Sequence, residues 1–163
     1  MRLPRSPIFG EMRGQSLVEM ALLLPVLLLL ALGIFDLSRA IQANNIIANL
    51  SREGANLISR TSNSADDIMA SLAATAQPLA MGKNGKMYVT EVKKVEGATR
   101  IEDVQSWGTG GPGSRVDGAN PGASLGTINL EDNQSVYIFE VFYKYDCMFM
   151  KPASIQLYSS SIF

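Results

Sequence analysis

The residues best placed to do chemistry stand near the N-terminus, where Gly14 and Gln15 are followed four positions later by Glu19. A carboxylate at the centre of a membrane helix costs about 2.5–3.5 kcal/mol on insertion scales, and less near the interface. A cut between Gly14 and Gln15 would create an α-amine one helical turn from Glu19, on the same face. That amine could neutralise the carboxylate, within one chain or between neighbours, beside the positive end of the helix dipole. A cut at this bond would therefore give the spacing a chemical reason, and it would give Glu19 a role in assembly and register.

Other chemistry finds little support in the residue types. The chain of 163 residues contains no His and one cysteine, Cys147, which excludes His-based triads, His metal sites and an internal disulfide. We expect Cys147 to be a buried structural residue. The acidic pairs Asp66-Asp67 and Glu131-Asp132 lie at expected helix caps or turns, without the spacing of a calcium loop. Because no convincing nucleophile–base pair stands out, we expect no enzyme, no cofactor and no bound metal.

The charge balance argues against a nucleic-acid partner. Fourteen basic and 15 acidic residues give a formal net charge of −1, which offers no general attraction to phosphates. Lys93-Lys94 is interpreted as a solvated strand face. The glycine-rich stretch 107–126 lacks the context of a phosphate-binding loop, so it is expected to be a connection and not a nucleotide site.

A long apolar run follows the predicted cleavage site. Met20–Phe35 contains no charged residue, and Leu17–Phe35 provides 19 residues, close to the roughly 20 that span a bilayer as a helix. The preceding segment carries three arginines and one acid, Glu11, a net charge of +2 that holds the N-terminus in the cytoplasm. The run therefore predicts a single-pass membrane helix, with the remainder of the chain on the far side.

Three kinds of N-terminal segment share this basic-then-apolar pattern. A cleaved secretory signal would use the small residues Ala31 and Gly33 and end near Gly33. A signal anchor would stay in the membrane, and a prepilin-type leader would be cut before the helix. An ordinary signal has no use for Glu19, so the third reading is favoured. The competing hypothesis is a secreted or periplasmic binding protein whose signal peptide is cut near Gly33.

The same residues resemble a known family. Arg13-Gly14 followed by Gln15–Glu19, and then an apolar run containing Pro25, is similar to the start of TadE-like pseudopilins of the tight-adherence (Flp-type, type IVb) pilus system. Ser51–Ala55 resembles a further segment common in these sequences. The resemblance covers residues 13–58, about a third of the chain.

The resemblance implies a minor pilin or pseudopilin that takes part in assembling or initiating the pilus, without catalysis. It implies cleavage after Gly14 by a dedicated prepilin peptidase, and partners among other pilins and the pilus assembly machinery through the N-terminal helix. The expected location is the bacterial inner membrane, with the N-terminus cytoplasmic and the head extracytoplasmic, or a surface pilus.

The elements that must position these residues divide the chain into four parts: a leader at 1–14, a transmembrane and assembly helix at 15–36, an amphipathic extension at 37–60 and an extracytoplasmic head at 61–163. One helix is predicted from about Gln15 to Ser59, with a kink at Pro25 or at Gly33. The apolar stripe of the extension is assigned to positions at helical spacing, with polar positions between them that include Asp36. These apolar positions are Leu37, Ile41, Ile46, Ala48, Leu50, Ala55, Leu57 and Ile58.

The head is predicted to be small and of mixed structure. Ser64 and Asp67 fit the N-cap of a helix at 65–76, and strands are expected at 87–95, 135–145 and 155–162, the last two joined by a turn at Lys151-Pro152. The face of the central strand that carries Tyr137, Phe139 and Val141 should pack against the amphipathic helix. The fold class is therefore α+β, with a long N-terminal helix on two or three antiparallel strands.

Overall fold

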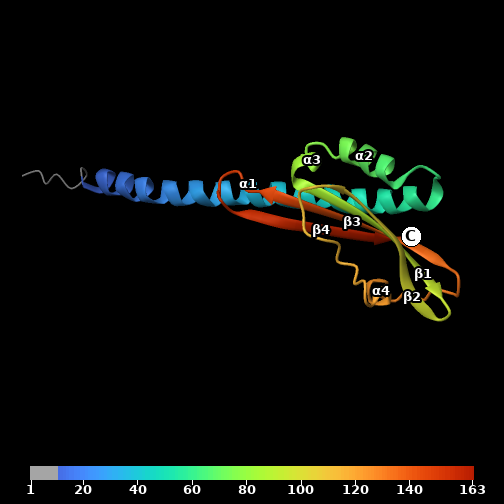
Figure 1. The fold of residues 1–163 in the computed structure, drawn as a ribbon. Helices are drawn as coiled ribbons and strands as arrows, with labels where there is room; N and C mark the ends of the chain where they lie inside the picture. The colour runs from blue at the N-terminus through green and yellow to red at the C-terminus, as the bar shows by residue number, and fades with distance from the viewer. Residues whose placement is uncertain (1–10) are drawn as a thin grey trace, which may run out of the picture.

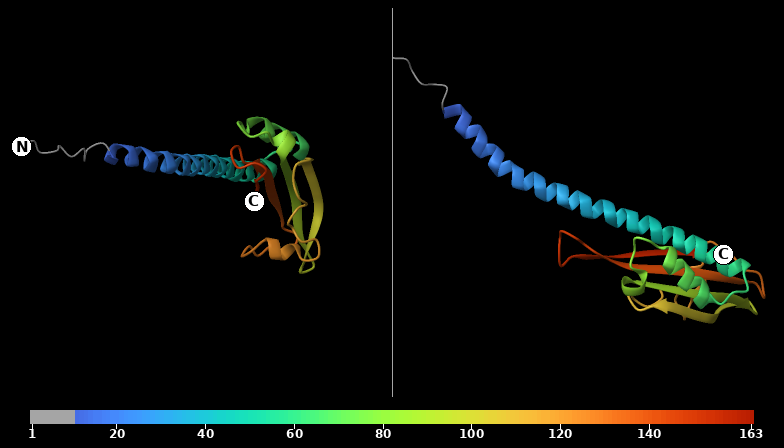
Figure 2. Two further views of the ribbon diagram at one scale, coloured as in Figure 1. Left: turned by 90° about the vertical axis from the view of Figure 1, so that its left-hand side faces the viewer. Right: turned by 90° about the horizontal axis from the view of Figure 1, so that it is seen from above.

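The computed structural model describes residues 11–163 of the chain, with side chains from residue 14 onward. The predicted leader at 1–14 therefore lies outside the described residues except for its last four. Those four residues belong to helix α1, Glu11–Arg60, which is about 75 Å long at 1.5 Å per residue. The helix thus begins before the predicted start at Gln15, and it runs unbroken through Pro25 and Gly33 with a gentle curve in its N-terminal half (Figure 2).

The C-terminal part of α1 lies on a four-stranded sheet in the order β2-β1-β3-β4, in which all neighbours are antiparallel. The strands are β1, Gly85–Val95, β2, Ala98–Gly108, β3, Ser135–Asp146, and β4, Ser154–Ile162. The expected α+β class is confirmed, as are the three predicted strands and the pairing of β3 with β4 across Lys151-Pro152. The count of two or three strands is wrong, because β2 forms a further edge.

Strand β2 escaped prediction because its residues carry little apolar signal. It pairs on one side only, with β1, and most of its residues are exposed. The two strands are joined by a tight turn at Glu96 and Gly97, which have φ angles of 52° and 79°. A two-residue hairpin loop of type I′ requires a positive φ angle at both of its residues. Glutamate is an uncommon residue there, so the sequence gave no clear hairpin signal.

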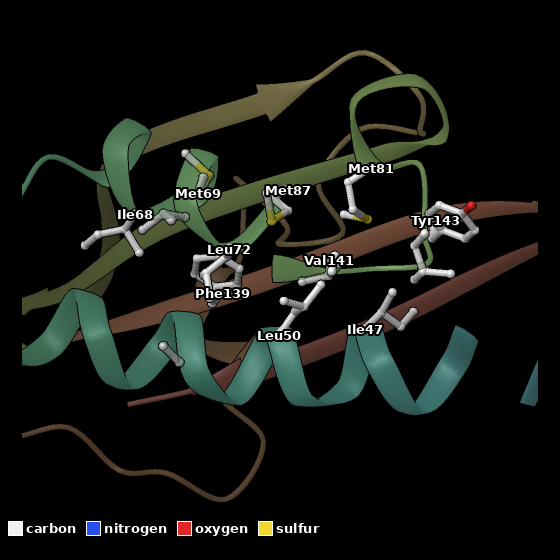
Figure 3. Packing of buried hydrophobic residues seen from close by; sticks show 14 of the residues in the cluster. Ile47, Leu50, Ile68, Met69, Leu72, Met81, Met87, Phe139, Val141 and Tyr143 are labelled. Atoms are coloured by element: carbon white, nitrogen blue, oxygen red, sulfur yellow. The ribbon is translucent and has the colours of Figure 1, made fainter. Parts of the chain in front are cut away.

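A main core fills the space between the sheet and the helices on one face (Figures 1 and 3). Helix α2, Ala65–Thr75, covers this face beside α1, and Ser64 caps it by accepting a hydrogen bond from the Asp67 amide, as predicted. Phe139, Val141 and Tyr143 of β3 point into this core, so the predicted packing of that strand face is confirmed (Figure 3). Ile47 and Leu50 of α1 lie opposite them.

The stripe by which α1 meets the sheet agrees with the predicted one in part, because Leu50 and Ala55 are buried and Ile46, Leu57 and Ile58 pack half-buried against the core. Leu37 and Ile41 were expected to face the core, yet they are 57% and 55% exposed. The buried positions follow a regular spacing of three and four residues and are mostly small: Asp36, Ala40, Ala43, Ile47, Leu50, Ser51, Gly54 and Ala55. Small side chains let the helix axis approach the sheet closely, so the bulky residues beside them remain outside.

A second, smaller core lies on the opposite face of the sheet. It joins Val92, Val136 and Ile138 with Leu125 and Leu130 of the long connection between β2 and β3. The connection was expected at 107–126 without regular structure; its first two residues belong instead to β2, and it contains the short helix α4, Pro121–Ser124. Helix α3, Met81–Asn84, leads into β1.

Candidate functional site

The predicted cleavage and register residues lie together on the first described turns of α1. The Gln15 side-chain amide donates to Glu19 Oε1 over 3.3 Å, and both residues are exposed. The i to i+4 spacing therefore puts positions 15 and 19 on one helix face, as expected. The Gly14–Gln15 peptide bond lies within the helix, and a Cβ built on Gly14 would meet no other atom within 4 Å. Space around Gly14 is therefore open to a peptidase.

The apolar run forms a bare helical rod. From Leu17 to Leu30 the large apolar side chains are exposed, and no other described part of the chain covers them. Leu32 is half-buried, and the Phe35 ring meets the Phe149 ring of the β3–β4 turn edge to face. By length and composition α1 can cross a membrane. Pro25 lies in the middle of this rod, and the helix continues through it. A functional kink at Pro25 stays a prediction.

The rod ends at a buried carboxylate that the sequence did not single out. Asp36 was assigned to the polar side of the helix, yet it is almost fully buried. It accepts three backbone N–H groups of the β3–β4 turn, from Met148 at 3.0 Å, Phe149 at 2.9 Å and Met150 at 3.2 Å. Hydrogen bonds to an ionised acceptor are roughly twice as strong as neutral ones. Asp36 therefore ties the turn to α1 directly after the apolar run.

The segment Ser51–Ala55 packs tightly against the sheet. The Ser51 hydroxyl lies 2.9 Å from Ser159 Oγ and 3.1 Å from Ser161 Oγ of β4. A Cβ on Gly54 would come within 2.5 Å of the Phe139 ring, so only glycine allows this packing. Arg52 and Glu53, between them, are exposed. Packing thus explains the small residues of the segment and not the charged ones.

The other buried carboxylate, Glu140 on β3, holds the glycine-rich connection. Its Oε1 accepts from the Arg115 amide at 3.0 Å and from the Tyr158 hydroxyl at 3.1 Å, and its Oε2 accepts from Ser114. Burial is the largest cause that raises the pKa of Tyr158, and the charge of Glu140 adds to it. The phenol therefore remains a donor at neutral pH. This set of donors fits a structural role, because each carboxylate oxygen is engaged by the fold itself.

The remaining candidate groups lie in separate places. Cys147 is buried after β3, as expected. Asp66 and Asp67 stand in the first turn of α2, and Asp132 accepts from the Gly97 amide at 2.9 Å, so the acidic pairs lie at a helix start and a turn as expected. Lys94 was expected to be a solvated surface charge. Instead, its Nζ donates a hydrogen bond to the Leu130 carbonyl at 2.8 Å. Within residues 14–163 no cluster of three or more acidic, cysteine or histidine side chains could hold a metal.

Comparison with known proteins gives one match. The family model of TadE-like proteins matches residues 14–56, about a quarter of the chain, so this segment is similar to that family. No curated protein matches, and no solved structure matches. The matched segment begins at the predicted cleavage site and contains the bare rod, Asp36 and the Ser51–Ala55 approach. It is therefore the part of the chain that forms the apolar rod and packs on the sheet, and most of the head lies outside the match.

Proposed function

From the TadE-like segment at residues 14–56, we propose that this chain is a minor pilin or pseudopilin that takes part in assembling or initiating a tight-adherence pilus. It acts without catalysis, after cleavage following Gly14. The observation that carries the proposal is the bare apolar rod, whose large side chains from Leu17 to Leu30 no described part of the chain covers. Such a surface is stable in lipid, and equally stable against the apolar helices of other pilins.

The length of the apolar surface supports a protein partner as well as a membrane. Exposed large apolar side chains continue beyond Phe35 to Leu37 and Ile41. From Leu17 to Ile41 the helix rises about 36 Å, whereas the hydrocarbon core of a bilayer is about 30 Å thick. The last turns are therefore apolar where a lone membrane anchor would meet water. A neighbouring pilin helix would cover them in an assembly.

Cleavage after Gly14 by a prepilin peptidase would prepare the rod for assembly. The bond lies within a helix, so the peptidase must unwind the first turns, and glycine lowers that cost by about 1 kcal/mol relative to alanine. The new α-amine of Gln15 would then find Glu19 of its own chain or of a neighbour. An ion pair between neighbours would set the register of the helices. The basic leader favours a cytoplasmic N-terminus and an extracytoplasmic head.

Substitution of Glu19 tests the register role. Glu19→Ala should leave the chain in the membrane fraction but cause a strong loss of surface pili, because the amine of a neighbour then has no partner. The matched control is Gln15→Ala, which removes the observed 3.3 Å hydrogen bond but keeps the carboxylate and the new amine. Pili would be counted by electron microscopy. Normal piliation in Glu19→Ala would refute the register role, as would an equal loss in both variants.

A further inference from the structure

We propose that the β3–β4 turn is a second membrane anchor, in which Met148, Phe149 and Met150 enter the headgroup boundary of the extracytoplasmic leaflet. The inference rests on the proposed crossing of the membrane by α1. The turn would fix the orientation of the head on the bilayer before assembly. The partner of the turn is therefore the lipid surface of the membrane that α1 spans.

The first observation is exposure. Met148, Phe149 and Met150 are consecutive large apolar residues that are 55%, 47% and 51% exposed. Single exposed apolar residues are common on protein surfaces, but a contiguous patch of them indicates an interaction site. The turn is also the part of the head that reaches furthest along α1 toward its N-terminal half (Figure 2). The patch thus faces the membrane side of the head.

The second observation is the level at which the turn is held. The Asp36 carboxylate fixes the amides of all three residues, and the rings of Phe35 and Phe149 meet edge to face with centroids 5.7 Å apart. Phe35 is the last residue of the apolar run. The 19 residues from Leu17 to Phe35 rise about 28 Å, close to the roughly 30 Å of bilayer hydrocarbon. A rod that spans the membrane therefore places Phe149 at the outer boundary beside Phe35, so that the turn is continuous with the membrane-facing surface of α1.

The third observation is the charge around the patch. Arg39 stands one turn beyond Phe35, with its guanidinium 5.7 Å from the Phe35 ring centroid and Nη1 3.6 Å from Met148 Sδ. Lys151 follows the patch and is exposed. Long cationic side chains bury their stems in apolar surface while their heads reach the lipid phosphates. Apolar residues bordered by two cations match a lipid interface better than the apolar face of a second protein.

Depth-dependent fluorescence quenching tests the proposal on the full chain. The native tryptophan is first removed by the substitution Trp107→Phe. One tryptophan is then introduced into this background by Phe149→Trp, Val104→Trp or Leu29→Trp. Val104 is a head residue exposed to a similar degree, at 47%, and lies on β2. Leu29 lies within the rod. Each variant is reconstituted into vesicles of phosphatidylcholine and phosphatidylglycerol, with bromine on the phosphatidylcholine acyl chains close to the headgroup.

The expected result is quenching and a blue shift at position 149, strong quenching at position 29 and neither effect at position 104. An unquenched tryptophan at 149 beside a quenched one at 29 would overturn the anchor while leaving the spanning helix intact. A blue shift at 149 without quenching would also overturn it, because protein, such as a second copy, would then cover the turn. An unquenched tryptophan at 29 would refute the spanning helix itself, and the anchor with it.

Discussion

At the scale of single residues, Asp36 fixes the β3–β4 turn to the end of the apolar run. A carboxylate directly after an apolar run suggests a simple boundary marker facing water. In the folded chain it is buried instead, since three consecutive amides of the β3–β4 turn converge on its two oxygens. Those donors are more than a hundred residues away in sequence. Local periodicity contains no information about them, so the burial of Asp36 could not be predicted.

Removal of this carboxylate should release the turn. Asp36→Ala takes away hydrogen bonds to a charged group, which are typically worth about 1.5–3 kcal/mol, so amide protection at positions 148–150 should fall about tenfold or more. Hydrogen–deuterium exchange of the full chain in detergent measures this directly. Asp66→Asn, at the exposed start of α2, is the control and should leave these amides unchanged. Unchanged protection in Asp36→Ala would show that the turn holds its place without the carboxylate.

At the scale of elements, the close approach of α1 to the sheet depends on glycine at one position. Gly54→Ala drives a methyl group into the Phe139 ring and should destabilise the head by about 1–3 kcal/mol, the usual cost of overpacking. Gly33→Ala is the matched control: it is the same substitution in the same helix, but it meets nothing within 4 Å. Urea unfolding of the full chain in detergent, followed by circular dichroism, compares the two. Equal unfolding midpoints would contradict this account of the helix–sheet contact.

The sequence predicted the elements better than their contacts. The capped helix α2, the aromatic strand β3 and its partner β4 were found because each has a strong local pattern. The core-facing stripe of α1 was predicted in part: Leu50 and Ala55 lie in the core, whereas Leu37 and Ile41 are exposed and small residues such as Ala40 are buried in their place. The reason is the close helix–sheet distance, a property of two elements together, which favours small residues at the contact. Strand β2 was missed because an exposed edge strand needs no apolar face.

The candidate site shows the same division. The cleavage site at Gly14 and Gln15 is implied by the resemblance, and helical spacing predicts that Gln15 and Glu19 share a face, as they do in the structure. The hydrogen bonds from the β3–β4 turn to Asp36, and the position of that turn beside Phe35, depend on the tertiary fold. They were therefore seen only in the structure. The turn itself was predicted at Lys151-Pro152, but its position beside Phe35 was not.

At the scale of the whole molecule, the chain consists of a bare apolar rod and a folded head. Every buried residue of α1 lies at Asp36 or beyond it within the described part of the chain. The head therefore does not need the rod for its own packing. A signal peptide cut near Gly33 and a leader cut after Gly14 would both leave the head intact. The two hypotheses differ in the fate of the rod, which the secreted or periplasmic protein would lose and the pilus assembly protein would keep.

Edman degradation tests this difference most directly, because it identifies the first residue of the mature chain. The chain is recovered from cells that make tight-adherence pili. Gly14→Leu is the control; its side chain meets open space within the chain, so any loss of cleavage reflects the peptidase. We predict that the native chain begins at Gln15 and that the Gly14→Leu variant stays uncut. A first residue just after Gly33, or an uncut native chain, would contradict the proposed function.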